Sequence, residues 1–207
     1  MGLLNLLIND PLTFILLAVP LLYSIILHEL AHGWVAYRMG DATAKWLGRL
    51  SLNPLKHLDP IGTLMLFIFG FGWAKPVPVN FNNLHDMRKG LILVSSAGIV
   101  VNMMLAFLAF FLFRLLAPAP SGVLATLLFY LAQINIILAS FNLIPIPPLD
   151  GSKILMGFVP ERFQYYLSRL EPFGLFIIIG LLYIGALDPL IAFFRWIILA
   201  LIGILLP

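Results

Sequence analysis

The 207-residue sequence contains no cysteine and few charged residues. Without cysteine the chain has no disulfide, no thiolate nucleophile and no cysteine-ligated zinc, so that a metal site needs histidine and carboxylate ligands. Only 10% of the residues are charged and 62% are hydrophobic, whereas an ordinary globular domain has about 25% charged residues. So few polar residues cannot cover a water-soluble surface, and so many apolar ones exclude disorder. The composition therefore predicts an integral membrane protein.

The sequence also lacks a basic cluster, an internal repeat and a linker. The net charge is only +3, and the basic residues are scattered, which argues against a nucleic-acid surface. We expect one domain over residues 1–207, with a catalytic core at about 11–153 and a C-terminal helical hairpin at about 168–207. The sequence does not indicate an oligomeric state.

Six apolar runs predict the membrane segments: 12–37, 61–71, 91–116, 123–143, 173–187 and 190–206. The first helix should start at Asp10 and Pro11, a good N-cap followed by proline at the first helical position, and should kink at Pro20. The run 61–71 is too short, since a spanning helix needs about 20 residues. The predicted fold is an all-α polytopic membrane protein with about five transmembrane helices. A re-entrant or interfacial segment and short β-like loops near the active site complete it.

The distribution of basic residues predicts the orientation. If the run 61–71 does not cross, one side receives ten of the twelve: Arg38, Lys45, Arg49, Lys56, Lys75, Arg88, Lys89, Lys153, Arg162 and Arg169. Only Arg114 and Arg195 fall towards the other side. The positive-inside rule then places the N-terminus outside a cell membrane and these ten residues in the cytoplasm.

The first long run contains His28-Glu29-Leu30-Ala31-His32, an HExxH motif. Residues four apart share one face of a helix, so both imidazoles can bind one metal while Glu29 flanks it as a base. The alternative is a polar cluster that stabilises helix packing. Intramembrane ionisable residues are functional by default, however, because each is costly to insert. From Pro11 to His28 the helix rises about 25 Å, which places the site just inside the cytoplasmic boundary.

A catalytic zinc needs a third protein ligand. The candidates are His57, His85, Asp41, Asp59, Asp86, Asp150, Glu161, Glu171 and Asp188. Asp150 differs from the others because three prolines in four positions precede it and force an extended chain at membrane depth. Its alternative role is the N-cap of a helix that begins near Ser152. Asp150 returns to the side of His28 only if the run 61–71 does not cross.

These motifs resemble those of the site-2 protease family of intramembrane zinc metalloproteases. The HExxH matches, and the stretch 142–151 is similar to the family's NxxPxPxxDG motif. The stretch 95–102 resembles the AGPxxN element, with Ile99 in place of the usual proline, and 48–54 and 72–80 resemble loops of short bacterial members. Ser152 stands where a second glycine is common.

The resemblance implies one zinc ion bound by His28, His32 and Asp150, with Glu29 as the catalytic base. It implies that Asn142 and Asn102 contact the substrate backbone or polarise the scissile carbonyl. The reaction is then hydrolysis of peptide bonds in or next to transmembrane segments of substrate proteins in the lipid bilayer.

Two other functions are weighed against the protease. In a metal or proton transporter the histidines and the aspartate would line an ion path, although the inverted repeats of many transporters are absent. An inactive homologue would hold membrane partners only. The sequence has neither GxSxG nor GxGD, so the serine and aspartyl intramembrane proteases are excluded.

Two loop segments have the period-two pattern of short strands, 49–53 and 73–81. Either both are plain loops at the membrane surface, or one lies beside the zinc and pairs with an unwound substrate. Of the two, 49–53 is expected to be the better template, since Pro76 and Pro78 remove N–H donors from the other.

Overall fold

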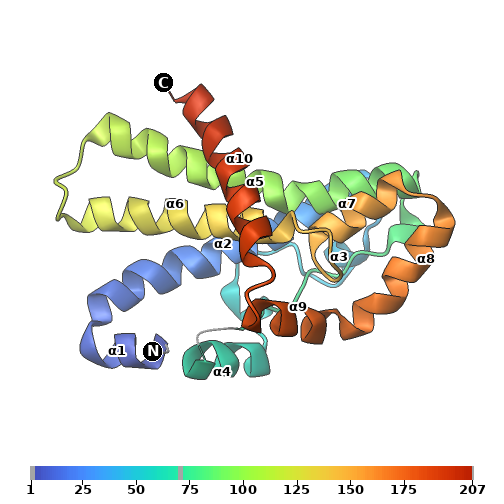
Figure 1. Ribbon diagram of the computed structural model, residues 1–207, viewed down its shortest axis with the longest axis horizontal. Coiled ribbons are helices and arrows are strands. Elements are labelled where there is room, and N and C mark those ends of the chain that lie inside the picture. Colours follow the sequence, from blue (N-terminus) through green and yellow to red (C-terminus); the bar gives the residue numbers. More distant parts are fainter. Residues whose placement is uncertain (1–2, 70–71, 207) are drawn as a thin grey trace.

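The computed structural model describes residues 3–69 and 72–206, and most of these residues are helical (Figure 1). The longer helices are α2 (Pro11–Arg38), α4 (Pro60–Phe69), α5 (Met87–Leu116), α6 (Val123–Asn142), α8 (Glu161–Leu170), α9 (Gly174–Tyr183) and α10 (Asp188–Leu205). The short ones are α1 (Leu3–Asn9), α3 (Thr43–Trp46), η1 (Pro54–Lys56), η2 (Phe81–Asn83), α7 (Asp150–Phe158) and η3 (Glu171–Phe173). Within the described ranges there is no strand, only an isolated bridge between Leu58 and Ala74. The predicted all-α fold is confirmed.

Five helical stretches are long and apolar enough to cross a membrane, as predicted: Pro11–Arg38, Met87–Leu116, Val123–Asn142, Glu161–Tyr183 and Asp188–Leu205. The fourth is composite, because η3 interrupts it between α8 and α9. The chain is therefore a multi-pass membrane protein. The terminal residues Met1, Gly2 and Pro207 of the predicted domain lie outside the described residues.

Helices α2, α5 and α6 form the centre of the molecule, and α5 and α6 run antiparallel in Figure 1. Small side chains are buried where these helices meet, among them Ala106, Ala132 and Ala139. Small residues let the backbones of membrane helices approach closely, which strengthens van der Waals packing without a hydrophobic driving force. Helix α10 joins this core through Ile198 and Ile202.

The start of α2 agrees with the prediction. The Asp10 carboxylate accepts a hydrogen bond from the Thr13 N–H at 3.1 Å, and Pro11 occupies the first helical position. Pro20 lies inside the helix. The helix ends at Arg38, and Gly40 takes a φ of 113°, a conformation that glycine adopts readily.

The short apolar run 61–71 does not cross the molecule. Its described part is α4, and Gly70 and Phe71 lie outside the described residues. The Lys75 N–H donates to the His57 carbonyl at 2.8 Å beside the bridge of Leu58 and Ala74, so both ends of the segment meet. The chain thus leaves and returns on one side, as expected of a re-entrant or interfacial segment.

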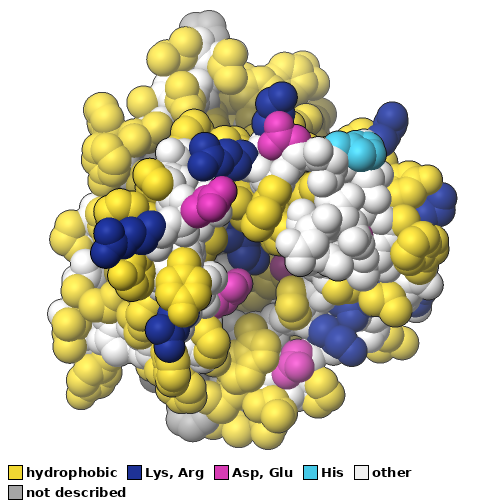
Figure 2. Space-filling view, turned by 90° about the vertical axis from the view of Figure 1, so that its right-hand side faces the viewer, with side chains coloured by type: hydrophobic (Ala, Val, Ile, Leu, Met, Phe, Trp, Pro, Cys, Tyr) yellow, Lys and Arg dark blue, Asp and Glu magenta, His cyan; other side chains and the backbone are white. Residues whose placement is uncertain are grey.

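The basic side chains are distributed as this topology predicts, with most of them at one end of the helical bundle. Lys and Arg are spread over the face at the end of the bundle where α3, α7 and α8 lie (Figure 2). Arg114 lies at the opposite end of α5, where its guanidinium donates to the Leu206 carbonyl.

The C-terminal helices support the proline-rich segment that follows α6. Ile144 and Leu149 of that segment form one buried cluster with Ile178 of α9 and Leu187. Gly174 permits this contact, because a Cβ there would lie 2.4 Å from the Pro147 carbonyl oxygen. The hairpin therefore holds the backbone that precedes Asp150.

Candidate active site

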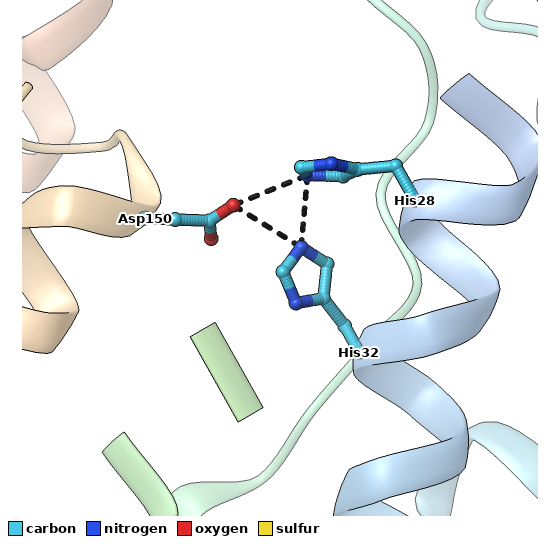
Figure 3. A group of neighbouring side chains, drawn as sticks. All are labelled: His28, His32 and Asp150. Atoms are coloured by element: carbon cyan, nitrogen blue, oxygen red, sulfur yellow. Dashed lines mark hydrogen bonds and ion pairs between the residues drawn. The ribbon is translucent and has the colours of Figure 1, made fainter. Parts of the chain in front are cut away.

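His28, His32 and Asp150 converge on one point between α2 and the start of α7 (Figure 3). The Nε2 atoms of the two histidines lie 2.9 Å apart. The Oδ2 atom of Asp150 lies 3.1 Å from the first and 3.2 Å from the second. All three residues are at least nine-tenths buried. The structure thus brings together the three residues expected to bind zinc.

The proline-rich segment positions Asp150. Helix α6 ends at Asn142, and α7 begins at Asp150 itself, with Leu149 as its N-cap and no capping side chain. The alternative role of Asp150 as an N-cap is therefore wrong, and its carboxylate faces the imidazoles instead. Gly151 permits the tight turn, since a Cβ there would lie 2.3 Å from the Leu143 carbonyl oxygen.

The Nδ1 atoms of both histidines are engaged on the side away from Asp150. His32 Nδ1 lies 2.7 Å from the Val94 carbonyl oxygen, and His28 Nδ1 lies 2.5 Å from Asn102 Oδ1. A carbonyl oxygen only accepts, so each Nδ1 carries the proton, and in a neutral imidazole Nε2 then presents a lone pair.

This arrangement fits a metal ion. Two imidazole lone pairs and a carboxylate oxygen within 3.2 Å of one another repel unless a cation or protons lie between them. Ligands about 2.0–2.1 Å from a tetrahedral zinc stand roughly 3.3 Å apart, close to the spacing found. The donor set of two histidines and a carboxylate is also one that catalytic zinc uses.

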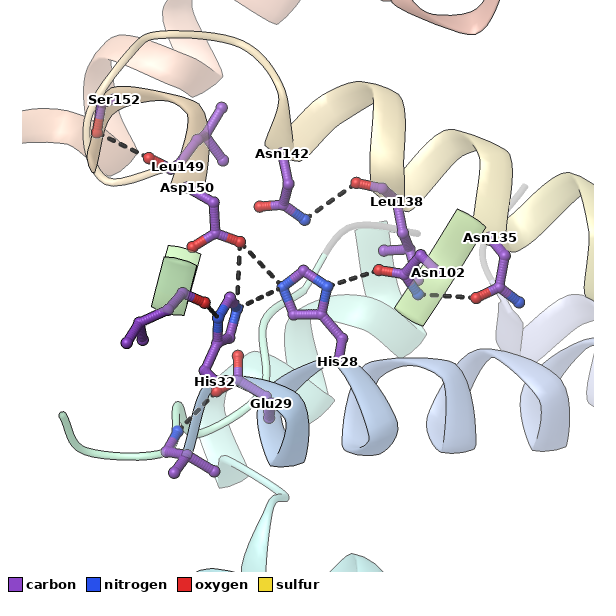
Figure 4. A network of polar contacts seen from close by, with 12 residues as sticks. His28, Glu29, His32, Asn102, Asn135, Leu138, Asn142, Leu149, Asp150 and Ser152 are labelled. Atoms are coloured by element: carbon purple, nitrogen blue, oxygen red, sulfur yellow. Dashed lines mark hydrogen bonds and ion pairs between the residues drawn. The ribbon is translucent and has the colours of Figure 1, made fainter. Parts of the chain in front are cut away.

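A chain of buried amides supports His28 (Figure 4). Asn102 donates through Nδ2 to Asn135 Oδ1 at 2.7 Å, and Asn135 donates to Ser24 Oγ at 2.8 Å. Both asparagines are fully buried. The chain links α2, α5 and α6 behind the metal-binding face. Sequence reasoning missed Asn135 and Ser24, although polar residues inside apolar runs were a visible signal.

Gly98 makes room for the His28 ring. A Cβ at this position of α5 would lie 2.5–2.6 Å from three atoms of the imidazole, closer than real contacts. Helix α5 thus contributes both the acceptor for His28 and the space that the ring needs.

Glu29 faces a cavity of about 330 Å³ beside the three converging residues. Its Oε2 accepts a hydrogen bond from the Val77 N–H at 2.7 Å. The cavity is lined by His28, Glu29, His32, Pro76, Val77, Pro78, Val79, Phe81, Val94, Ser95, Asn142, Pro148, Leu149, Asp150 and Lys153. It is therefore bounded by α2, α5, the start of α7 and the loop before η2.

Of the two loop segments, 73–81 borders this cavity and 49–53 does not. Arg49 of the segment 49–53 binds the segment 73–81: its Nη2 donates to the carbonyls of Lys75 at 2.8 Å and Pro76 at 3.1 Å. The Ser51 carbonyl is engaged by His57 Nε2 at 2.7 Å. The choice of 49–53 as the better template for a substrate strand is wrong, because that segment holds the neighbouring loop rather than the site.

The two asparagines expected to contact substrate differ in their surroundings. Asn142 lines the cavity, and its Nδ2 donates to the Leu138 carbonyl at 3.0 Å. Asn102 is enclosed between His28 and Asn135 and is not among the cavity-lining residues of the described chain.

The other candidate ligands have separate partners where the structure shows them. Asp41 is fully buried and accepts from Thr43, Asn80 and Asn83. Burial raises the pKa of Asp41, but these hydrogen bonds outweigh burial and lower it overall. Asp59 and Asp86 accept from backbone N–H groups of α4 and α5, and Glu171 pairs with Lys153.

The chain is similar in sequence to known proteins. The family model described as Peptidase family M50 matches residues 117–184, which include the stretch that carries Asp150. YwhC of Bacillus subtilis (strain 168), named as a zinc metalloprotease, is 42% identical over 187 residues, 87% of this chain and 84% of YwhC. Rip2 of Mycolicibacterium smegmatis, also named as a zinc metalloprotease, is 32% identical over 179 residues, 84% of this chain and 69% of Rip2.

A more distant relative is zinc metalloprotease MJ0392 of Methanocaldococcus jannaschii, 26% identical over 160 residues, 77% of this chain and 39% of the relative. No solved structure matches the chain. Between the protease and the transporter that the sequence left open, these relatives support the protease. The likeness to YwhC over most of both chains shows that this protein belongs to Peptidase family M50, the site-2 protease family, and is an intramembrane zinc metalloprotease.

Proposed function

We propose that the protein is an endopeptidase that cleaves peptide bonds in or next to transmembrane segments of other membrane proteins. In this proposal His28, His32 and Asp150 hold the zinc ion, and Glu29 is the catalytic base. The observation that carries it is the convergence of three ligand atoms inside a membrane-spanning bundle, with a carboxylate on the same cavity.

Bound zinc would supply the Lewis acid that polarises the scissile carbonyl and makes water acidic enough to be deprotonated near neutral pH. Glu29 accepts the proton of the attacking water and returns it to the leaving amine. The Val77 N–H holds the Glu29 carboxylate at the cavity wall by its hydrogen bond to Oε2. Asn102 keeps the His28 ring in the orientation that directs Nε2 towards Asp150.

The charges of the site suit a membrane. Two neutral imidazoles and the Asp150 carboxylate leave a bound Zn²⁺ with a net charge of about +1, and ionised Glu29 brings the site close to zero. A nearly neutral site costs far less to bury in lipid than a single charge does.

The size of the cavity limits the form of the substrate. A volume of about 330 Å³ accommodates extended chain, whereas a helix with its side chains is about 10–12 Å across. A helix also hides its carbonyls in its own hydrogen bonds. The substrate segment must therefore unwind locally before cleavage, and Asn142 at the cavity wall is positioned to contact its backbone.

We place the site near the cytoplasmic face of the cell membrane, with the N-terminus outside. The basic face of the bundle supports this orientation through the positive-inside rule (Figure 2). Because the chain has no cysteine, single cysteines report it without background. Lys75→Cys and Glu161→Cys should react with an impermeant reagent from the cytoplasm, and Ser121→Cys from outside; the reverse pattern would overturn the orientation.

The catalytic assignment is tested with purified full-length protein and a model transmembrane substrate. Glu29→Gln should keep its zinc and lose cleavage, because it removes the base and no ligand. Asp150→Ala should lose both zinc and cleavage, while His85→Ala, an exposed histidine outside the cavity, should keep both. Cleavage at the wild-type rate by Glu29→Gln would show that Glu29 is not the base.

A further inference from the structure

The hydroxyl of Ser95 is buried at the cavity wall without a hydrogen-bond partner. Ser95 lies on α5, its residue is 1% exposed, and it lines the cavity that Glu29 faces. Two other buried serines behave differently. Ser140 and Ser152 each donate to a carbonyl three or four residues earlier, both at 2.7 Å.

Two residues close to Ser95 on α5 contact the histidines of the site. The carbonyl of Val94 accepts from His32, and Gly98, almost one turn further along, makes room for His28. Ser95 is therefore part of the helix wall that both imidazoles contact.

Several groups that border the rest of the cavity have no N–H to offer or already use one. Pro76 and Pro78 have no N–H, and the Val77 N–H is used by Glu29. The Asn142 amide uses one of its two N–H groups to bind the Leu138 carbonyl, and the Lys153 ammonium is 3.7 Å from Glu171. An unwound segment at membrane depth carries unpaired carbonyls, each of which is costly unless it finds a donor.

We infer that the Ser95 hydroxyl donates a hydrogen bond to a backbone carbonyl of the unwound substrate, so that Ser95 is a substrate-binding residue. This inference rests on the proposed peptidase function. A buried hydroxyl without a partner costs free energy in the free enzyme. That cost disappears when a carbonyl arrives, which favours binding of peptides over lipid chains. Because every residue of a substrate has a backbone carbonyl, this hydrogen bond adds affinity without selecting for a particular substrate side chain.

The test compares Ser95→Ala with Ser96→Ala, its half-buried neighbour on the same helix. Full-length protein is assayed for zinc content, thermal midpoint, kcat and KM with a model transmembrane substrate. Ser95→Ala should keep its zinc and its thermal midpoint, since it removes a group without a partner, and should lower kcat/KM about 3- to 10-fold. Ser96→Ala should stay within about twofold of the wild type in kcat/KM, because Ser96 does not line the cavity.

Wild-type kcat/KM in Ser95→Ala would overturn the inference. A lower thermal midpoint with unchanged kcat/KM would also overturn it, because the hydroxyl would then have a structural partner.

A binding measurement separates this inference from the proposed function. In Glu29→Gln, which should bind substrate without cleaving it, the Kd for the same substrate is compared with and without Ser95→Ala. A rise in Kd of about 3- to 10-fold supports the role of Ser95 even if no cleavage is found, and an equal Kd refutes it. Failure of the wild type to cleave would refute the proposed function alone.

Discussion

Replacement of Gly98 by alanine tests whether α5 fixes the His28 ring. The added Cβ would lie 2.5 Å from Cε1 and 2.6 Å from both ring nitrogens of His28. To reach an ordinary contact of 3.4 Å, the ring must retreat by about 0.8 Å. It cannot retreat freely, because Asn102 holds Nδ1 at 2.5 Å on one side and Asp150 faces Nε2 on the other. A shift of this size exceeds the tolerance of about 0.2 Å for zinc-ligand distances.

Two opposing effects set the magnitude. Alanine is about 1 kcal/mol more favourable than glycine inside a helix, while overpacking a tight site costs about 1–3 kcal/mol. Stability should therefore change little or fall by up to about 2 kcal/mol. Zinc affinity should fall about 10- to 100-fold, the range expected when the support of a ligand is disturbed. Peptidase activity should fall with zinc occupancy.

The assay is zinc content per mole of protein after equilibration with a competing chelator, together with cleavage of a model substrate. Gly180→Ala is the matched control, because nothing lies within 4 Å of a Cβ at that position of α9. It should retain zinc and activity and show only the gain in helix propensity. If Gly98→Ala holds zinc and cleaves like the wild type, the packing of His28 against α5 is not what fixes this ligand.

Three further predictions concern the supports of the site and of its loop. Asn102→Leu removes the acceptor for His28 Nδ1 and should weaken zinc binding about 10- to 100-fold in the same competition assay. Removal of zinc by a chelator should abolish cleavage and lower the thermal midpoint, and added zinc should restore both; zinc at 100 times its Kd contributes about 2.7 kcal/mol. Asp41→Asn should cost about 1–3 kcal/mol at pH 7, because buried donors lose a charged acceptor. The pKa of Asp41 lies below its ordinary 3.8, so the stabilisation is present above pH 3.8 and is lost as the pH falls through the folded-state pKa. The difference in thermal midpoint between wild type and Asp41→Asn should therefore shrink below about pH 3.8, and a constant difference would contradict this account.

The sequence predicts the metal-binding residues because their geometry is largely local. Helical spacing alone places His28 and His32 on one face of α2. The prolines end α6 before Asp150, as predicted, but the extended chain expected there is wrong: residues 143–149 form successive turns, in which the Leu149 N–H donates to the Ile146 carbonyl at 3.0 Å. The shortness of α4 alone excludes a crossing, and this exclusion fixes the side on which Asp150 returns.

The partners of these residues could not be predicted in the same way. Asn102 and Asn135 are visible as polar residues in apolar runs, but contact between them depends on how α5 and α6 are rotated about their axes. That rotation is set by the packing of small residues such as Ala106 and Ala139. The van der Waals energy of such packing depends on the shape of the two helix surfaces, which no periodic sequence pattern reveals. The amides then reach His28 only in the assembled bundle.

The loops show a related limit. A period-two pattern identifies extended chain, but it does not say which of two extended segments lies beside α2. In the structure both lie there, and Gly33 makes room for them, because a Cβ there would lie 2.6 Å from a Leu50 methyl and 2.7 Å from a Val77 methyl. Both segments therefore approach the helix one residue after His32, and Arg49 holds the second by its backbone carbonyls. With Val77 held there, its N–H reaches Glu29. The proposed base is thus oriented by a loop outside the helical bundle. Gly33, the residue after the HExxH motif, lets this loop come close enough for the Val77 N–H to hold the Glu29 carboxylate.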